Sequence, residues 1–332
     1  MKTTVLYIAG WGRSGSTILA NSLNELEGYF HIGEFCHVWE NAVLNDYPCG
    51  CGTPVRECPY WSAVFRKALG RFPSPADARH MISLRRETPS NADILLRRAH
   101  TRKPFALSEY RKRIGDLYAA MAATADARVI IDSSKNPYHL FLLSTIESLN
   151  VHVLHLVRDP RATAYSWMRK RLRSDVGGGR SVEMEQFSPV TNSRKWTICN
   201  LTIQSMHDRF AGYARLRYED FVQDPALAVE SLRGPLHLPD RASPFGNNRR
   251  IVLTGNHTVW GNPKRTTLGE IEIRPDLEWT EQMSRWDQAR ASVFSWPLMW
   301  HYGYPLLGSS LAVPPQRPTE RAVPHGFPPS AT

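Results

Sequence analysis

The stretch TTVLYIAGWGRSGSTILANSL, residues 3–23, decides how this chain folds. Its apolar run at residues 5–9 has the length and composition of a buried strand in a parallel sheet. Three glycines follow within six residues, and a helical pattern begins at Thr17. A strand, a glycine-rich loop and a helix in this order direct backbone N–H groups and a helix N-terminus to one point. The segment therefore predicts an anion-binding loop.

The loop lacks the lysine of an ATP-binding loop, which reads G-x-x-x-x-G-K-[ST]. Gly10 and Gly15 have the required spacing, but Ser16 occupies the lysine position. The cation comes earlier, as Arg13, whose guanidinium can bind a phosphate through two hydrogen bonds. Hydroxyl groups follow this arginine at Ser14, Ser16 and Thr17. We expect an anionic ligand other than ATP, and the alternative is a glycine- and serine-rich turn that holds no ligand.

Further apolar runs alternate with helical stretches along the chain. The strand candidates are residues 128–132, 151–157 and 214–218, and the helical stretches include residues 108–125 and 193–210. Such alternation predicts an α/β fold, a mostly parallel sheet with helices on both faces. We expect one domain over residues 1–307, with an insertion at 36–127 that is irregular at first and then helical, and a mobile loop at 173–190. Residues 308–332 are rich in Pro, Ser, Thr and Arg, and we expect a disordered tail there.

The chain carries a formal net charge of +10, from 41 basic and 31 acidic residues. Such a surplus suits an acidic partner, which could be a nucleic acid, an anionic membrane or a small polyanion. The chain has no recognisable nucleic-acid-reading motif, so we expect no nucleic acid partner. No apolar stretch approaches the ~18–20 residues that span a bilayer, and the N-terminus does not resemble a signal peptide. We therefore expect a cytoplasmic protein without an integral membrane segment.

A second phosphate site is predicted by VHVLHLVRDPRATAYSWMRKR, residues 151–171. A buried strand ends at Arg158, and Asp159 and Pro160 are suited to the N-cap and first position of a helix. Ser166 lies eight residues after Arg158, two turns into that helix. An arginine at the carboxyl end of a strand and a serine on the next helix can bind one phosphate together. For residues 170–173 we expect a solvated basic helix face.

These segments resemble the sulfotransferases that use 3′-phosphoadenosine 5′-phosphosulfate (PAPS). GRSGST, residues 12–17, is similar to their 5′-phosphosulfate loop, and HLVRDPRATAYS, residues 155–166, to their 3′-phosphate motif, especially that of carbohydrate sulfotransferases. The resemblance extends to LRYEDFVQDP, residues 216–225, and more loosely to GNPKR, residues 261–265, in the order of the family. It implies the sulfotransferase fold, a P-loop NTPase-like parallel sheet flanked by helices.

The resemblance also implies a donor site. The residues that would hold the 5′-phosphosulfate are Arg13, Ser14, Gly15, Ser16 and Thr17. Arg158 and Ser166 would hold the 3′-phosphate, and Lys264 and Arg265 would close over it. Tyr218 occupies the position of an aromatic ring near the adenine, with a core tyrosine as the alternative. PAPS would then be the donor and 3′-phosphoadenosine 5′-phosphate (PAP) the product, with no metal required.

Two residues are candidates for catalysis beside Arg13. Glu34, in FHIGEFCHVWE (residues 30–40), follows a strand-like stretch and resembles in context and spacing the catalytic glutamate of tyrosylprotein sulfotransferases. It would act as the general base on the acceptor hydroxyl. Lys135, in IIDSSKNPYHL (residues 130–140), resembles a lysine of glycosaminoglycan sulfotransferases and would stabilise the bridging oxygen as PAP leaves. A structural role for Glu34, or a different base such as a histidine, stays open.

The expected function is transfer of a sulfuryl group to a hydroxyl of a small-molecule, carbohydrate or glycolipid acceptor. The alternative is a P-loop kinase or NTPase, for which Asp132 would be the metal-binding acid. Specificity would come from residues 36–127 and 173–190, which the resemblance constrains least. The sequence does not tell the acceptor or the oligomeric state.

The chain has five cysteines, an odd number. Cys49, Cys51 and Cys58 lie close together in CGCGTPVREC. The spacing C-x-C-x6-C is not among the common zinc-ligand spacings. We therefore expect reduced or partly paired thiols here and no metal in the functional site, with a structural zinc site as the alternative.

Overall fold

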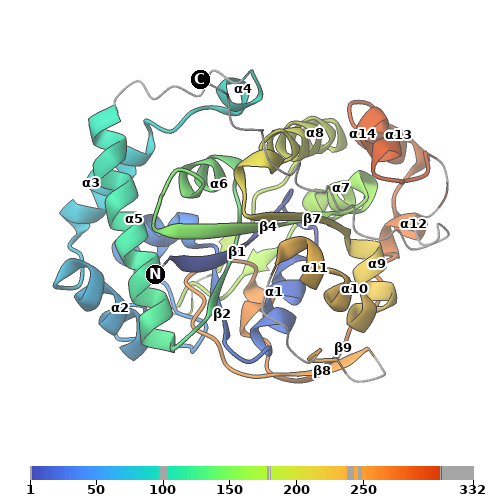
Figure 1. Cartoon of the computed structure of the whole chain (residues 1–332). Helices are drawn as coiled ribbons and strands as arrows, with labels where there is room; N and C mark the ends of the chain where they lie inside the picture. The colour runs from blue at the N-terminus through green and yellow to red at the C-terminus, as the bar shows by residue number, and fades with distance from the viewer. Residues whose placement is uncertain are drawn as a thin grey trace, which may run out of the picture.

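The computed structural model describes residues 2–96, 104–177, 179, 181–237, 243–245, 249–306 and 308. Its centre is a five-stranded parallel sheet in the order β2-β3-β1-β4-β7 (Figure 1). The strands are β1 (Thr3–Ala9), β2 (Tyr29–Gly33), β3 (Val129–Lys135), β4 (Leu149–Val157) and β7 (Gly212–Arg217). The expected parallel α/β sheet is confirmed. Sequence placed the end of the third of these strands at residue 132, and the structure extends it to Lys135.

Side chains of each strand alternate between the two faces of the sheet, as strand geometry requires. Val5 and Tyr7 of β1 belong to the apolar core on one face, whereas Leu6 and Ile8 belong to the core on the other. Figure 1 shows α6 and α8 on one side of the sheet and α1, α10 and α11 on the opposite side. Both faces are therefore buried, which explains why these strands are continuous apolar runs in the sequence.

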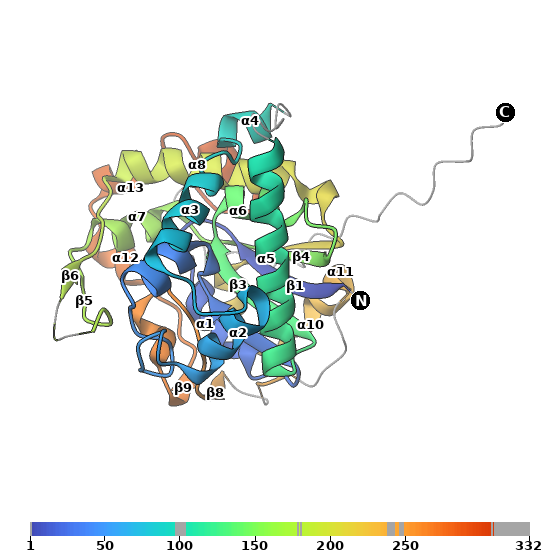
Figure 2. The ribbon, with the colours of Figure 1, turned by 90° about the vertical axis from the view of Figure 1, so that its left-hand side faces the viewer.

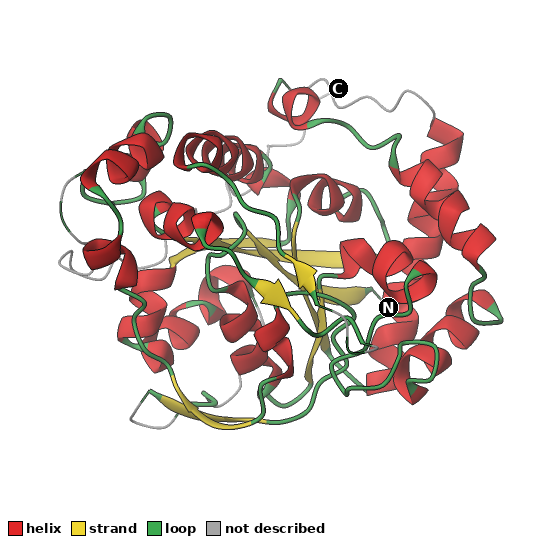
Figure 3. Cartoon of the chain, turned by 180° about the vertical axis from the view of Figure 1, so that it is seen from behind, coloured by secondary structure: helices red, strands yellow, loops and turns green. Residues whose placement is uncertain are grey.

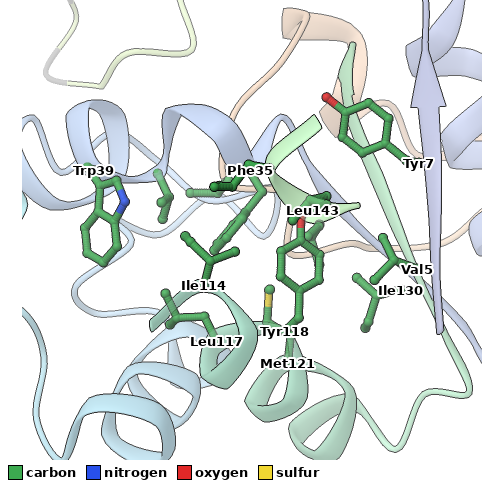
Figure 4. Packing of buried hydrophobic residues seen from close by; sticks show 14 of the residues in the cluster. Val5, Tyr7, Phe35, Trp39, Ile114, Leu117, Tyr118, Met121, Ile130 and Leu143 are labelled. Atoms are coloured by element: carbon green, nitrogen blue, oxygen red, sulfur yellow. The ribbon is translucent and has the colours of Figure 1, made fainter. Parts of the chain in front are cut away.

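The first face packs against α5 (Pro104–Ala125), α6 (Pro137–Leu143) and α8 (Pro189–Ser205). In Figure 4, Tyr118 of α5 lies between the side chains of Ile114 and Leu117 on one side and those of Val5 and Ile130 of the sheet on the other. The second face packs against α1 (Ser16–Asn24), α9 (Tyr218–Gln223), α10 (Pro225–Ser231) and α11 (Arg233–Leu236). Each fully buried aliphatic side chain here stabilises the fold by about 1.5–3 kcal/mol.

The insertion at residues 36–127 is irregular at first and then helical, as expected. A 3-10 turn (Phe35–His37) and a π-helix (Val38–Leu44) precede α2 (Pro59–Leu69), α3 (Pro75–Arg85), α4 (Asn91–Leu95) and α5. Ser74 and Ser90 cap α3 and α4 through reciprocal hydrogen bonds with Asp77 and Asp93. In Figure 2 these helices lie beside one another, with α5 crossing in front of the sheet.

After β4 the chain forms α7 (Pro160–Met168), which Asp159 caps as the sequence predicts. Two antiparallel hairpins lie outside the main sheet: β5 (Leu172–Arg173) with β6 (Val182–Glu183), and β8 (Arg250–Leu253) with β9 (Gly269–Glu272). Figure 3 shows β8 and β9 below the sheet, and Figure 2 shows β5 and β6 projecting from the body. The remaining elements are the 3-10 turns His207–Arg209 and Pro263–Thr266 and the helices α12 (Glu278–Gln282), α13 (Arg285–Ser292) and α14 (Trp296–His301).

The expected basic helix face at residues 170–173 is wrong. Helix α7 ends at Met168, and the backbone of Arg169 is extended. Arg173 lies in β5 and is buried, because Asp175 pairs with its guanidinium and the Trp260 ring lies 3.6 Å beneath it. The expected disordered tail, residues 308–332, lies outside the described residues apart from residue 308. Among the helices that the structure describes, none is long and apolar enough to cross a membrane.

Candidate active site

A cavity of about 1040 Å³ opens at the carboxyl edge of the sheet. Ligands of open parallel α/β sheets bind at this edge, where the strands end and the loops begin. Most of the residues singled out from the sequence line this cavity: Arg13, Gly15, Ser16, Thr17, Glu34, Lys135, Arg158, Ser166, Tyr218 and Lys264. Segments separated by more than 200 residues in the chain thus meet at one place.

The floor of the cavity is the loop between β1 and α1. Gly15 has φ +89° and forms the N-cap of α1, and no side chain caps this fully described helix. The first N–H groups of an α-helix have no partner within the helix, so here they are available to a ligand. A Cβ atom on Gly15 would lie 2.4 Å from Cδ2 of Tyr218, so the tyrosine ring packs directly on the loop.

Ser14 lies in this loop beside the cavity lining and is buried. Its Oγ has no hydrogen-bond partner among the described residues. A buried hydroxyl without a partner costs free energy, so a ligand bound at the loop that reached this oxygen would lower that cost.

Arg13 lies in the loop with φ +68°, a conformation uncommon outside glycine. Its guanidinium stacks 4.8 Å from the Trp167 ring. Burial and the charge of Arg171 lower the pKa of Arg13 to about 10, so it remains charged at neutral pH. Arg169, Arg171 and Arg173 also line the cavity, and such a concentration of cations favours a polyanionic ligand.

Arg158 leaves the end of β4 and is buried. Its Nη1 donates to the carbonyl oxygen of Arg13 at 3.1 Å, and its Nη2 lies 3.1 Å from Oδ2 of Asp276. The guanidinium lies 4.3 Å from the centre of the Tyr218 ring, and Ser166 lines the same cavity from α7. The Nε of Arg158 is buried and has no hydrogen-bond partner among the described residues. Arg158, predicted to bind a second phosphate, and Tyr218, predicted to lie near a nucleobase, are therefore adjacent.

Glu34 and Lys135 form an ion pair in the same cavity, with Nζ 2.6 Å from Oε1. Lys135 has φ +64° and also donates to the carbonyl oxygen of Ser133 at 2.8 Å. The backbone of Glu34 is held by a hydrogen bond from its N–H to the carbonyl oxygen of Trp260. Burial opposes ionisation of Glu34, but Lys135 and His37 outweigh it and keep the pKa of the carboxyl below its usual value. Glu34 is therefore a carboxylate that can accept a proton.

Asp132, the acid of the kinase alternative, lies away from the cavity lining and is fully buried. Its carboxylate accepts hydrogen bonds from the Tyr118 hydroxyl and from the N–H and hydroxyl of Ser134. His139 Nε2 lies 3.4 Å away. These partners occupy the carboxylate, so it is not presented to a ligand.

Arg265 does not reach the cavity, although Lys264 beside it does. The Arg265 guanidinium is 1% exposed, pairs with Asp175 and donates to the carbonyl oxygen of Pro48 at 2.8 Å. These contacts hold Arg265 inside the fold, although its Nε has no hydrogen-bond partner among the described residues. Closure of Arg265 over a phosphate stays a prediction. Its neighbour Lys264 is exposed to the cavity.

Sequence reasoning missed several residues that shape the cavity. Trp167 follows Ser166 directly, and its Nε1 donates to the carbonyl oxygen of Gly12 at 3.2 Å. The position of this tryptophan in the segment 151–171, directly after a predicted phosphate-binding serine, was a signal that could have indicated it. Asp276, which pairs with Arg158, belongs to no recognisable pattern and is 118 residues away.

Comparison with known proteins identifies one family. A family model described as "Sulfotransferase family" matches residues 6–241. Two solved structures are similar: a sulfotransferase domain from the curacin biosynthetic pathway (16% identity, 92% of this chain and 99% of that chain, TM-score 0.49) and sulfotransferase STF1 from Mycobacterium tuberculosis H37Rv (12% identity, 72% and 68%, TM-score 0.38). No curated protein matches the chain.

Proposed function

Since this chain belongs to the sulfotransferase family, we propose that it transfers a sulfuryl group from PAPS to a hydroxyl group of its acceptor. The observation that carries the proposal is the Glu34–Lys135 pair, which lies in the same cavity as the arginine-bearing loop. A carboxylate and a cation beside an anion-binding loop suit a transfer between an acceptor hydroxyl and a phosphate-linked donor.

The chain's residues fit a donor of this kind. Two buried polar atoms, Ser14 Oγ in the loop and Arg158 Nε at the end of β4, have no partner among the described residues, which supports an anionic ligand between them. The 5′-phosphosulfate would be held by Arg13, the loop hydroxyls and the N-terminus of α1. The 3′-phosphate would be held by Arg158, Ser166 and Lys264, and Tyr218 would lie near the adenine.

PAPS supplies an activated sulfuryl group with a phosphate as its leaving group. Glu34 accepts the proton of the acceptor hydroxyl, a contribution of roughly 10²–10⁴-fold to the rate. Lys135 releases Glu34 and donates a hydrogen bond to the bridging oxygen, which becomes negative as PAP leaves. One well-placed donor of this kind is worth roughly 2.7–4 kcal/mol.

No divalent metal is needed in the cavity by this proposal. The transferred sulfuryl group carries less negative charge than a phosphoryl group, and several cations line the cavity: Arg13, Lys135, Arg158, Arg169 and Arg171. Turnover is expected to be independent of Mg²⁺, unlike that of a kinase.

The acceptor is proposed to enter on the side of the insertion and the β5–β6 hairpin. The Tyr47 and Trp260 rings stack at 5.2 Å there, and His37 and Asn41 also line the cavity. Aromatic rings beside polar groups suit an acceptor such as a phenol or a sugar. Both a small molecule and a glycan with a free hydroxyl remain within the proposal.

The direct test is incubation of the chain with PAPS and a panel of phenols, sugars and nucleosides, with product masses and released PAP measured together. Sulfated product with equimolar PAP supports the proposal. Phosphorylated product from ATP–Mg²⁺, with no sulfated product from any acceptor, would establish the kinase alternative instead.

A further inference from the structure

Three cysteine sulfurs and one histidine nitrogen lie close together outside the cavity lining. The Cys/His cluster consists of Cys49, Cys51, Cys58 and His257, whose ligand atoms all lie within 4.8 Å of one another. The histidine is 199 residues from the last cysteine and comes from a different part of the fold. This distance explains why the cysteine spacing alone does not indicate a metal site.

Four of the six separations within the cluster are close to those of tetrahedral coordination. A zinc ion with Zn–S bonds of about 2.3 Å and Zn–N bonds of about 2.0–2.1 Å separates two sulfur ligands by about 3.8 Å and a sulfur from a nitrogen by about 3.6 Å. The Cys58 sulfur lies 3.7 Å from that of Cys49 and 3.8 Å from that of Cys51. His257 Nδ1 lies 3.6 Å from the Cys49 sulfur and 3.3 Å from the Cys58 sulfur.

A disulfide explains this arrangement less well. A disulfide bond is about 2.0 Å long, and three thiols pointing at one another cannot all be paired. We propose that the Cys/His cluster binds one Zn²⁺ ion through three thiolates and one imidazole, as a structural site. Four protein ligands leave no open coordination position, so the ion serves folding rather than catalysis.

The loop that carries the cysteines is folded so that the three sulfurs lie close together, with Cys49 and Cys58 buried and Cys51 exposed. The N–H of Cys49 donates to the carbonyl oxygen of Thr53, and the N–H of Gly52 donates to the carbonyl oxygen of Cys49, both at 2.8 Å. Gly52 has φ +90°, and a Cβ on Gly50 would lie 1.9 Å from Oδ1 of Asn256. The two glycines of the CGCG turn are therefore required by its geometry.

The imidazole is held in place by its neighbours. The His257 ring stacks on Tyr60 at 5.1 Å and on Phe30 at 6.2 Å. The indole N–H of Trp61 donates to the carbonyl oxygen of His257 at 2.8 Å. Outer contacts of this kind orient metal ligands and are part of a metal site.

The proposed ion links the cysteine loop to a wall of the cavity. The loop also contacts that wall directly: the N–H of Gly50 donates to the carbonyl oxygen of Thr258 at 2.9 Å, and Tyr47 stacks on Trp260. Trp260 in turn accepts a hydrogen bond from the N–H of Glu34. Loss of the ion would therefore loosen the wall that supports Glu34.

The test is elemental analysis of the full chain, purified in reducing buffer without chelator. We expect one zinc ion per chain. Cys49→Ser, Cys58→Ser and His257→Ala should each lose most of it, whereas Cys199→Ser, which changes an equally buried cysteine outside the cluster, should keep it. Zinc content does not depend on sulfotransfer, so this test is separate from the test of the proposed function.

Replacement of the metal by Co²⁺ in the unaltered chain provides a measurement that needs no variant. Tetrahedral thiolate coordination predicts a thiolate-to-cobalt charge-transfer band and intense d–d absorption, both removed by added Zn²⁺. An unaltered chain that retains neither Zn²⁺ nor Co²⁺ after dialysis against the ion in reducing buffer would overturn the proposal. So would zinc that stays stoichiometric in both Cys58→Ser and His257→Ala.

Discussion

Lys135 Nζ lies 2.6 Å from Glu34 Oε1 at the point where two neighbouring strands end. Glu34 follows β2 directly, and Lys135 is the last residue of β3. Each residue restricts the other: the lysine keeps the carboxyl ionised, and the carboxylate holds the lysine until a ligand competes for it. Both side chains are mostly buried, Glu34 being 17% and Lys135 14% exposed, so water screens their interaction little.

Glu34→Gln is expected to lower kcat by roughly 10²–10⁴-fold, because the amide cannot accept the acceptor's proton. PAP affinity should change little, since the substitution removes no group of the proposed donor site. Steady-state kinetics and calorimetric titration measure the two quantities on one sample. Glu185→Gln, which changes an exposed carboxylate at the cavity rim, is the matched control. Near-normal turnover in Glu34→Gln would remove Glu34 as the base and direct attention to His37 or Lys135.

Lys135→Met is expected to move the acid limb of the pH–rate profile to higher pH. Burial raises the pKa of Glu34 and Lys135 lowers it, with the lowering dominant in the native site. Removing the lysine leaves the effect of burial, so the carboxyl needs a higher pH to ionise. The profile of kcat/KM against pH measures this shift. An acid limb at the same pH in both proteins would show that the pair does not control the group that titrates in turnover.

Arg158→Ala is expected to weaken PAP binding by roughly 10–100-fold, the value of one or two hydrogen bonds to a charged group. Calorimetric titration measures it. Arg290→Ala, which removes an exposed guanidinium on α13 away from the cavity, should bind PAP normally. Unchanged affinity in Arg158→Ala would place the 3′-phosphate elsewhere.

Gly15→Ala is expected to destabilise the fold by about 2–4 kcal/mol, since it combines backbone strain at positive φ with a clash against the Tyr218 ring. Gly70→Ala isolates the first effect, because Gly70 has φ +78° but no atom within 4 Å of its added Cβ. It should cost only about 1–2 kcal/mol. Urea denaturation compares the two variants, and equal losses would show that Tyr218 does not pack closely on the loop.

The core of the fold could be predicted from sequence because its signals are local. The apolar runs before Gly10 and Arg158 are buried on both faces, so their strand character is visible without knowledge of their neighbours. The parts that could not be predicted depend on partners distant in the chain. Arg265 is withdrawn from the cavity by Asp175, and Arg173 is buried by Trp260.

The candidate site follows the same division. Ser16 and Ser166 line the cavity, and each lies in a helix that follows a strand end, so the local sequence pattern was enough to place them. His257 completes the Cys/His cluster from 199 residues away, beyond the reach of any spacing rule. The left-handed backbone of Lys135 is likewise a consequence of the tertiary site and leaves no sign in composition.

The measurement that tests the central claim most directly is calorimetric titration of the chain with PAP and, in parallel, with ATP–Mg²⁺. The account predicts saturable one-site binding of PAP without added metal, weakened roughly 10–100-fold in Arg158→Ala, with ATP–Mg²⁺ bound much more weakly. Tight binding of ATP–Mg²⁺ together with no binding of PAP would contradict it, because the arginine-bearing loop and Arg158 would then serve a different nucleotide.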